Sequence, residues 1–70
     1  MEDHVYKIIE IAASSTAGVD DAIRSGVKRA SETLQNLRWF EVKELRGHIA
    51  EGEVAHFQVV LRIGFTLADH

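Results

Sequence analysis

Apolar residues recur with two different spacings in the first half of this 70-residue chain. Residues 5–12 (VYKIIEIA) are rich in β-branched and apolar side chains, which favours a strand. From Val19 onwards the apolar residues are three or four positions apart, as on one side of an amphipathic helix. This helical stripe consists of Val19, Ile23, Val27, Ala30 and Leu34. We therefore predict a first strand at residues 5–12 and a helix that begins near Val19.

Polar residues mark both ends of the predicted helix. Ser14 and Ser15, in the segment SSTAG, are expected to supply the N-cap. Asp20 and Asp21 lie in the first turn, where the helix dipole favours negative charge. At the other end, Asn36 is expected to stop the helix.

Two further strands follow, at about residues 37–48 and 54–67, and Gly52 lies between them. Because Gly has a permissive backbone, the segment from Ala50 to Glu53 predicts a hairpin turn. The last strand alternates: one face carries Phe57, Val59, Leu61, Ile63, Phe65 and Leu67, and the other carries His56, Gln58, Val60, Arg62, Gly64 and Thr66. The apolar face must meet the helical stripe, since no other segment can cover it.

The order strand, helix, strand, strand indicates an α+β fold. The helical connection leaves the second strand parallel to the first, and the hairpin makes the third strand antiparallel to both. A third strand inserted between the other two makes every pair antiparallel, and its continuous apolar face favours that central position. We predict a β-α-β-β fold in which a three-stranded antiparallel sheet, of order 1-3-2, packs on one helix.

Trp39, the only tryptophan, is followed directly by Phe40, and neighbours in a strand point to opposite faces. Phe40 and Val42 are two positions apart, so their side chains point to the same face of the strand. We expect that face to lie in the core under the helix. Trp39 is then expected on the opposite, uncovered face of the sheet. The side chains expected beside it there are Tyr6, Ile8, Glu41, Lys43, Gln58, Val60 and Arg62. A large aromatic ring on an apolar face without a covering element indicates an interface or a ligand site.

The predicted hairpin turn also sets which residues lie opposite each other. Opposed residue numbers should add up to about 103, which places Trp39 opposite Arg62 or Gly64. Gln58 would then lie on the order of 14–20 Å from Trp39 within one chain. A bulge near residues 44–45 would not close that gap. We therefore expect Trp39 and Gln58 of different chains to meet at one site.

Length and composition restrict the class of protein. Seventy residues form a single domain, 1–70, which buries only about 60% of its unfolded surface and is marginal alone. The chain has no Cys and therefore no disulfide bond to stabilise the domain. We expect oligomerisation to supply the missing stability. The net charge of −3, without a basic run, argues against nucleic acid as a partner. No segment is apolar and long enough for a membrane span, and we expect a compact cytoplasmic protein.

Four residues are candidates for binding a ligand, and each has a simpler interpretation. The indole of Trp39 is a stacking platform for a planar ring, or it only packs at a subunit contact. The amide of Gln58 matches the edge of a uracil-like or pteridine-like ring, or it is solvated. Arg38 and Arg46 are candidates for a ligand phosphate, or they are solvated or paired with acidic neighbours.

No group of residues indicates catalysis or a metal site. The histidines, which are His4, His48, His56 and His70, have no helical spacing and no carboxylate partner nearby in sequence, and we interpret them as surface residues. No Ser/His/Asp or Cys/His arrangement suggests a nucleophile. We predict that the protein is not an enzyme.

The segments that carry these candidates resemble the dodecins, a family of small flavin-binding proteins. The resemblance runs from VYKIIEI through RASETLQNL to RWFEVKELRG and FQVVLRIGF. It implies a hollow homododecamer of β-α-β-β protomers that holds flavin pairs between symmetry-related tryptophans. Trp39 matches the stacking Trp of the family, Gln58 the Gln at the ring edge, and Arg46 a basic position of bacterial members. Where many bacterial members have a second Arg, this chain has Thr66.

The resemblance implies flavin storage and photoprotection, with FMN favoured over riboflavin or FAD and coenzyme A as a further candidate ligand. Two other classes of function remain open. In a purely structural shell or interaction module the purified protein would be colourless and would ignore added flavin. In a flavoenzyme that needs a partner, substrate would bleach the bound flavin.

Overall fold

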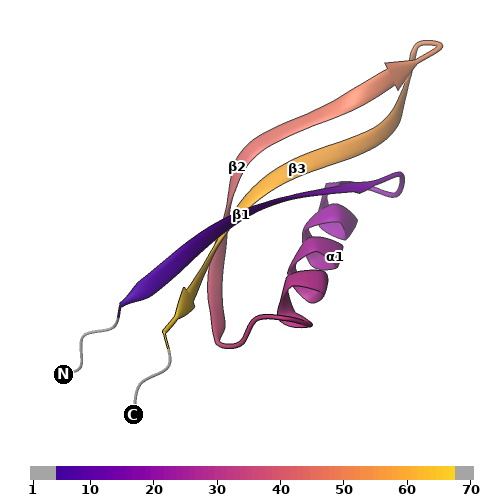
Figure 1. Cartoon of the computed structure of the whole chain (residues 1–70). Helices are drawn as coiled ribbons and strands as arrows, with labels where there is room; N and C mark the ends of the chain where they lie inside the picture. The colour runs from indigo at the N-terminus through magenta and orange to yellow at the C-terminus, as the bar shows by residue number, and fades with distance from the viewer. Residues whose placement is uncertain (1–4, 68–70) are drawn as a thin grey trace.

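The computed structural model describes residues 5–67, which form one helix and one three-stranded sheet (Figure 1). Strand β1 spans Tyr6–Ser15, helix α1 spans Val19–Ser31, and strands β2 and β3 span Leu37–Ala50 and Glu53–Thr66. The strand order is β1-β3-β2, and β3 is antiparallel to both neighbours. The predicted fold class, topology and strand order are therefore confirmed.

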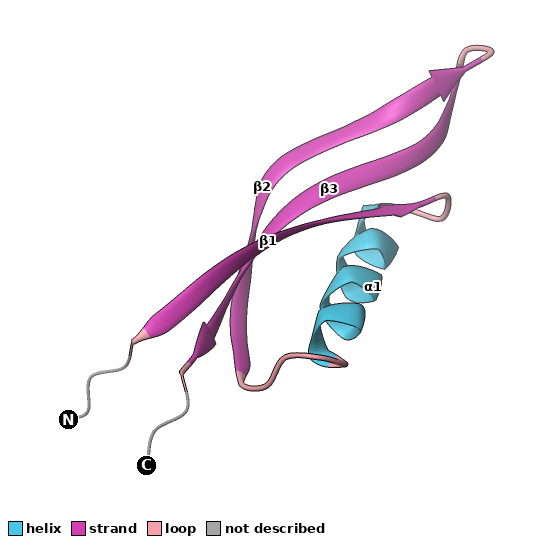
Figure 2. Ribbon diagram, viewed as in Figure 1, coloured by secondary structure: helices cyan, strands magenta, loops and turns pink. Residues whose placement is uncertain are grey.

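The hydrophobic core lies between α1 and the central strand β3, because the helix packs on one face of the sheet only (Figure 2). Val59, Leu61 and Ile63 of β3 are fully buried, as the alternation of the last strand predicts. The apolar residues that pack around them while keeping some exposure are Ile9, Ile11, Ala13, Val19, Ile23, Val27 and Leu37.

The deepest side of α1 consists of small residues, and the larger residues of the predicted stripe flank them. Ala22, Gly26 and Ala30 are the buried residues of the helix. A Cβ atom at Gly26 would lie 3.1 Å from the Cβ of Ala13 and 3.3 Å from the Cδ1 of Leu61. Small residues on this side let the helix approach the sheet closely, so the helix lies close to β1 and β3.

The start of the helix differs from the prediction. Ser14 and Ser15 belong to β1, and the N-cap residue is Gly18. The Oγ of Ser15 accepts hydrogen bonds from the backbone N–H of Ala17 (2.9 Å) and of Gly18 (3.3 Å), and it donates to Asp21 (2.7 Å). Ser15 therefore joins the end of β1 to the first helical turn without capping the helix itself.

The end of the helix also differs. The helix ends at Ser31, so Leu34 and Asn36 lie beyond it, although the N–H of Leu34 still donates to the carbonyl of Ala30 (3.0 Å). Asn36 has a φ of 66°, a left-handed conformation that Asn tolerates well. Its carbonyl accepts from the N–H of Thr66 (3.2 Å). Asn36 thus turns the chain into β2 instead of stopping the helix.

The hairpin between β2 and β3 confirms the predicted turn and register. Its two central residues, Glu51 and Gly52, have positive φ angles of 54° and 80°, as a type I′ turn requires. Trp39 pairs with Gly64, which is one of its two predicted partners. The register shifts between Val42 and Glu44, close to the residues 44–45 at which a bulge was considered, and Trp39 still lies far from Gln58.

The expectation that Phe40 and Val42 are buried is wrong for this chain. Their side chains face the helix side of the sheet but are 48% and 43% exposed. The reason is that α1 lies against β1 and β3, while β2 and the far half of the hairpin extend past it (Figure 1). Other apolar residues of the hairpin are exposed too, among them Leu45, Ile49 and Val54.

The shape of the chain is elongated. Its radius of gyration is 14.6 Å and its longest extent is 54 Å, whereas a compact domain of this length has a radius of gyration of about 11 Å. Within residues 5–67, no helix combines the length and hydrophobicity needed to cross a membrane. The exposed apolar residues on a projecting hairpin indicate that the fold is completed by contacts with another chain.

The close approach at Gly26 generates a stability prediction. Gly26→Leu should lower the free energy of unfolding by about 1–3 kcal/mol, because the added atoms overlap β1 and β3. Urea unfolding followed by circular dichroism measures this change. Ser25→Leu is the matched control, since it adds the same side chain at the next, exposed position. Equal stabilities of the two variants would contradict the close packing of α1.

Candidate functional site

The sheet face opposite α1, here called the outer face, carries an aromatic cluster at one end. Trp39 is 38% exposed there, and its ring lies 6.3 Å from the ring of Tyr6 at an interplanar angle of 63°. Both Trp39 on β2 and Ile8 on β1 pair with Gly64 of the central strand. Thr66 pairs with Tyr6 at the same end. The predicted placement of Tyr6, Ile8 and Trp39 on one face is confirmed.

The indole of Trp39 rests on Gly64. A Cβ atom built on Gly64 would lie 2.7 Å from the Nε1 of Trp39, and closer still to its Cε2 and Cζ2. Any side chain larger than hydrogen would therefore displace the ring. Sequence reasoning placed Gly64 on this face but assigned it no role. The signal that could have identified it is a glycine inside a strand, which often marks the close approach of another group.

Gln58 lies on the same face but far from the aromatic cluster. It is half-buried and pairs with Arg46 of β2 and with Ser14 of β1. Gln58 and Gly64 are six positions apart on β3, which corresponds to roughly 20 Å along the strand. The fold therefore does not bring Trp39 and Gln58 of one chain together, in agreement with the register argument.

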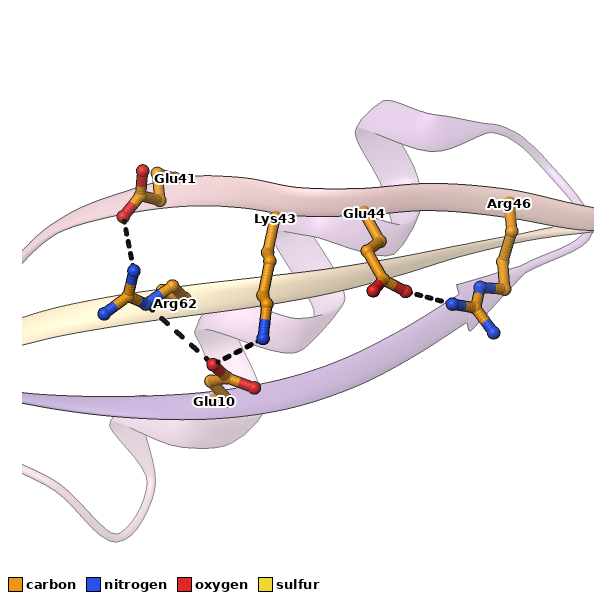
Figure 3. Close-up of polar contacts among 6 residues, drawn as sticks. All are labelled: Glu10, Glu41, Lys43, Glu44, Arg46 and Arg62. Carbon is orange, nitrogen blue, oxygen red and sulfur yellow. Dashed lines mark hydrogen bonds and ion pairs between the residues drawn. The ribbon is translucent and has the colours of Figure 1, made fainter.

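A row of four charged residues separates the two ends of the outer face (Figure 3). The Arg62 guanidinium contacts Glu41 at 3.6 Å and Glu10 at 3.9 Å, and the Nζ of Lys43 binds Glu10 at 3.1 Å. These residues come from all three strands. Each pair is substantially exposed and contributes at most about 1 kcal/mol, so the row shapes the electrostatics of the face more than its stability.

The two candidate phosphate ligands lie far apart along β2, one near Trp39 and the other near Gln58. Arg46 is beside Gln58 and contacts Glu44 of its own strand. Arg38 lies at the register shift between Leu37 and Trp39, where it pairs with no residue of β3. With Trp39 it lines a small hollow of about 120 Å³, which lies toward the helix side of the sheet because Val27, Phe40 and Ile63 line it too. Arg38 forms no ion pair within the described part of the chain. Arg38 thus accompanies Trp39, and Arg46 accompanies Gln58.

Two histidines continue the outer face beyond Gln58. His48 and His56 pair across β2 and β3, and their rings are stacked with centroids 5.6 Å apart and an interplanar angle of 13°. His48 is exposed and His56 half-buried, so neither belongs to the core. His4 and His70 lie outside the described residues.

A larger hollow, of about 440 Å³, lies on the other side of the sheet between α1 and β1. Apolar residues such as Ile9, Ile11 and Ala30 line it, and Arg29 lies at its edge. Neither Trp39 nor Gln58 takes part. It is an uncovered part of the core and not the site that the sequence predicts.

Comparison with known proteins identifies the family. The dodecin family model matches residues 5–68. A dodecin from Thermus thermophilus is 48% identical over 65 residues, which are 93% of this chain and 94% of that protein. The solved structure of a dodecin from Streptomyces coelicolor has 48% identity and a TM-score of 0.90, with complete coverage of both chains. A dodecin from Streptomyces davaonensis has 48% identity and a TM-score of 0.89, and the match covers 97% of this chain and all of that one.

The resemblance first noted in four separate sequence segments therefore extends over the whole fold. The helix, the three strands and the strand order agree with those of solved dodecins. Membership in this family also implies a multimeric assembly, in keeping with the uncovered hairpin. The chain belongs to the dodecin family.

Proposed function

We propose that this protein binds flavin between its subunits, and that it stores the flavin and protects it from light. The observation that carries the proposal is the indole of Trp39, which rests on Gly64 and lies partly exposed on a face that no helix or strand of residues 5–67 covers. An exposed aromatic ring in this setting suits stacking on a planar heteroaromatic ring, which contributes roughly 1–3 kcal/mol. The dodecin family membership supports a flavin as that ring.

Each site uses residues of different protomers. Trp39 of one chain supplies the stacking surface, and Gln58 of another chain supplies an amide that donates to and accepts from the ring edge. The roughly 20 Å between these residues within one chain supports this division. Contact between uncovered sheet faces in a homododecamer would bring the two kinds of residue together.

The positions of the arginines bear on the identity of the flavin. Arg46 lies beside Gln58, so the protomer that holds the ring edge also offers a guanidinium for a phosphate. Arg38 offers a second guanidinium from the protomer that supplies Trp39. This arrangement favours FMN, although riboflavin and FAD share the same ring. Thr66 brings no charge at the position where many bacterial relatives have Arg, and coenzyme A is a further candidate ligand.

The bound state is one of sequestration, not of turnover, and the protein is proposed to act in the cytoplasm. Flavin absorbs blue light and is reactive when excited. An indole in van der Waals contact can transfer an electron to the excited ring and take it back, which returns both partners to their initial state. Trp39 would therefore quench the bound flavin, while enclosure between protomers excludes water and reaction partners.

Assembly can be tested directly. Because the hairpin leaves Phe40, Val42 and other apolar residues uncovered, the protein should form a single large oligomer, proposed to contain twelve chains. Native mass spectrometry gives the number of chains. A monodisperse monomer at micromolar concentration would contradict both the assembly and the shared site. The absorption spectrum of the same sample, with the released chromophore identified, distinguishes a flavin protein from a colourless shell.

Trp39→Ala tests the stacking platform. Flavin affinity should fall by about one to two decades, which corresponds to the loss of the stacking energy. Any flavin that remains bound should fluoresce more brightly, because the quenching indole is absent. Fluorescence titration with FMN measures both effects. Unchanged affinity together with unchanged emission would show that Trp39 does not contact the flavin.

Mixed assemblies test whether the site is shared between chains. Trp39→Ala chains retain Gln58, and Gln58→Ala chains retain Trp39. If the two residues of a site come from different protomers, oligomers refolded from an equal mixture should bind FMN more tightly than either variant alone. If both came from one protomer, every site in the mixture would be defective. A mixture that binds no better than the separate variants therefore excludes the shared site.

A further inference from the structure

We propose that Gly64 is the positioning residue that lets the Trp39 indole rest against the central strand and thereby keeps the exposed part of the ring available for flavin. The inference rests on the proposed flavin site for its functional consequence. Its structural part, the dependence of the indole orientation on Gly64, stands on the geometry of the chain alone.

The backbone of β3 does not itself require glycine at this position. Within residues 5–67, Gly52 is the only glycine whose φ angle lies in the left-handed region, whereas that of Gly64 does not. Gly64 therefore has a conformation that an L-residue can adopt. A glycine inside a strand is unfavourable, because its backbone loses more freedom on folding and it has no side chain to pack. Some other demand must account for glycine at a buried position of the central strand.

That demand is the space taken by Trp39. The three atoms nearest to a Cβ built on Gly64 are Cε2, Cζ2 and Nε1 of the indole, and no backbone atom is among them. The closest conflict of an added methyl group is therefore with the Trp39 ring. Gly47 differs in this respect, because a Cβ there would lie 2.7 Å from the backbone carbonyl of His56.

The neighbours of the ring support the same interpretation. Gly64 lies on the central strand, where β1 and β2 hold it on both sides. Tyr6 meets the indole at an angle of 63° and limits movement toward β1. Trp39 rests on Gly64 and is still 38% exposed, so part of the ring stays accessible from outside the chain. A methyl group at position 64 would lift or tilt the ring and change the surface that it offers.

Two measurements test the proposal on the assembled protein. Since Trp39 is the only tryptophan, near-ultraviolet circular dichroism and indole fluorescence of the flavin-free protein report on this ring. Gly64→Ala should change both spectra, whereas Gly18→Ala, whose added methyl group meets open space, should leave both unchanged. Parental spectra for Gly64→Ala would overturn the proposal whether or not flavin binds.

A double-mutant cycle tests the functional part. Gly64→Ala should weaken FMN binding by about tenfold in the parental chain, which corresponds to about 1.4 kcal/mol of coupling to Trp39. In the Trp39→Ala background it should have no further effect on the residual binding. An equal loss in both backgrounds, or unchanged affinity alongside altered Trp39 spectra, would overturn the role in flavin binding. A parental chain without affinity for FMN would instead overturn the proposed function and leave the spectral test standing.

Thermal unfolding covers the case in which the single variant does not fold. Because the three atoms nearest to the added methyl group all belong to the indole, the combined variant Gly64→Ala with Trp39→Ala should fold. A folded double variant beside an unfolded Gly64→Ala variant supports the proposal. If neither folds while Trp39→Ala does, Gly64 is needed for the strand itself and the proposal fails.

Discussion

The difference in length between one helix and one hairpin governs this structure. Helix α1 has 13 residues and is roughly 20 Å long, whereas each strand of the hairpin has 14 residues and spans roughly 46 Å. No placement of the helix can cover the hairpin. Because α1 approaches closely through Ala22, Gly26 and Ala30, it buries the middle of β3 and leaves β2 beyond Leu37 uncovered. The stability of a chain built in this way cannot be separated from its assembly.

The features that follow from local rules could be predicted from the sequence. The alternation of β3 identifies its buried face, and Gly52 permits the tight turn that sets the hairpin register. The register in turn places Trp39 opposite Gly64 and far from Gln58. These steps depend on neighbouring residues and on one turn, so they need no knowledge of how α1 sits on the sheet.

The features that depend on tertiary packing could not be predicted in the same way. The alternation of β2 places Phe40 on the helix side of the sheet, but its burial depends on which strands the helix covers. Ser15 has the chemistry of an N-cap, yet β1 continues through it and Gly18 takes that place. The contact of Trp39 with Gly64 depends on the rotamer of the indole, which a strand pattern does not encode. The pattern thus located the residues of the candidate site but not their contacts.

The charged row across the outer face has a further consequence for a protein that assembles with itself. Glu10, Glu41, Lys43 and Arg62 comprise two acids and two bases, so their formal charges cancel. In a two-fold symmetric contact a surface patch meets its own copy, and a surplus of either sign would repel itself. A neutral row with alternating signs avoids that repulsion. Its acidic residues can also pair with the basic residues of the second copy, and its basic residues with the acidic ones. Identical chains can therefore bring their outer faces together without a counterion between them.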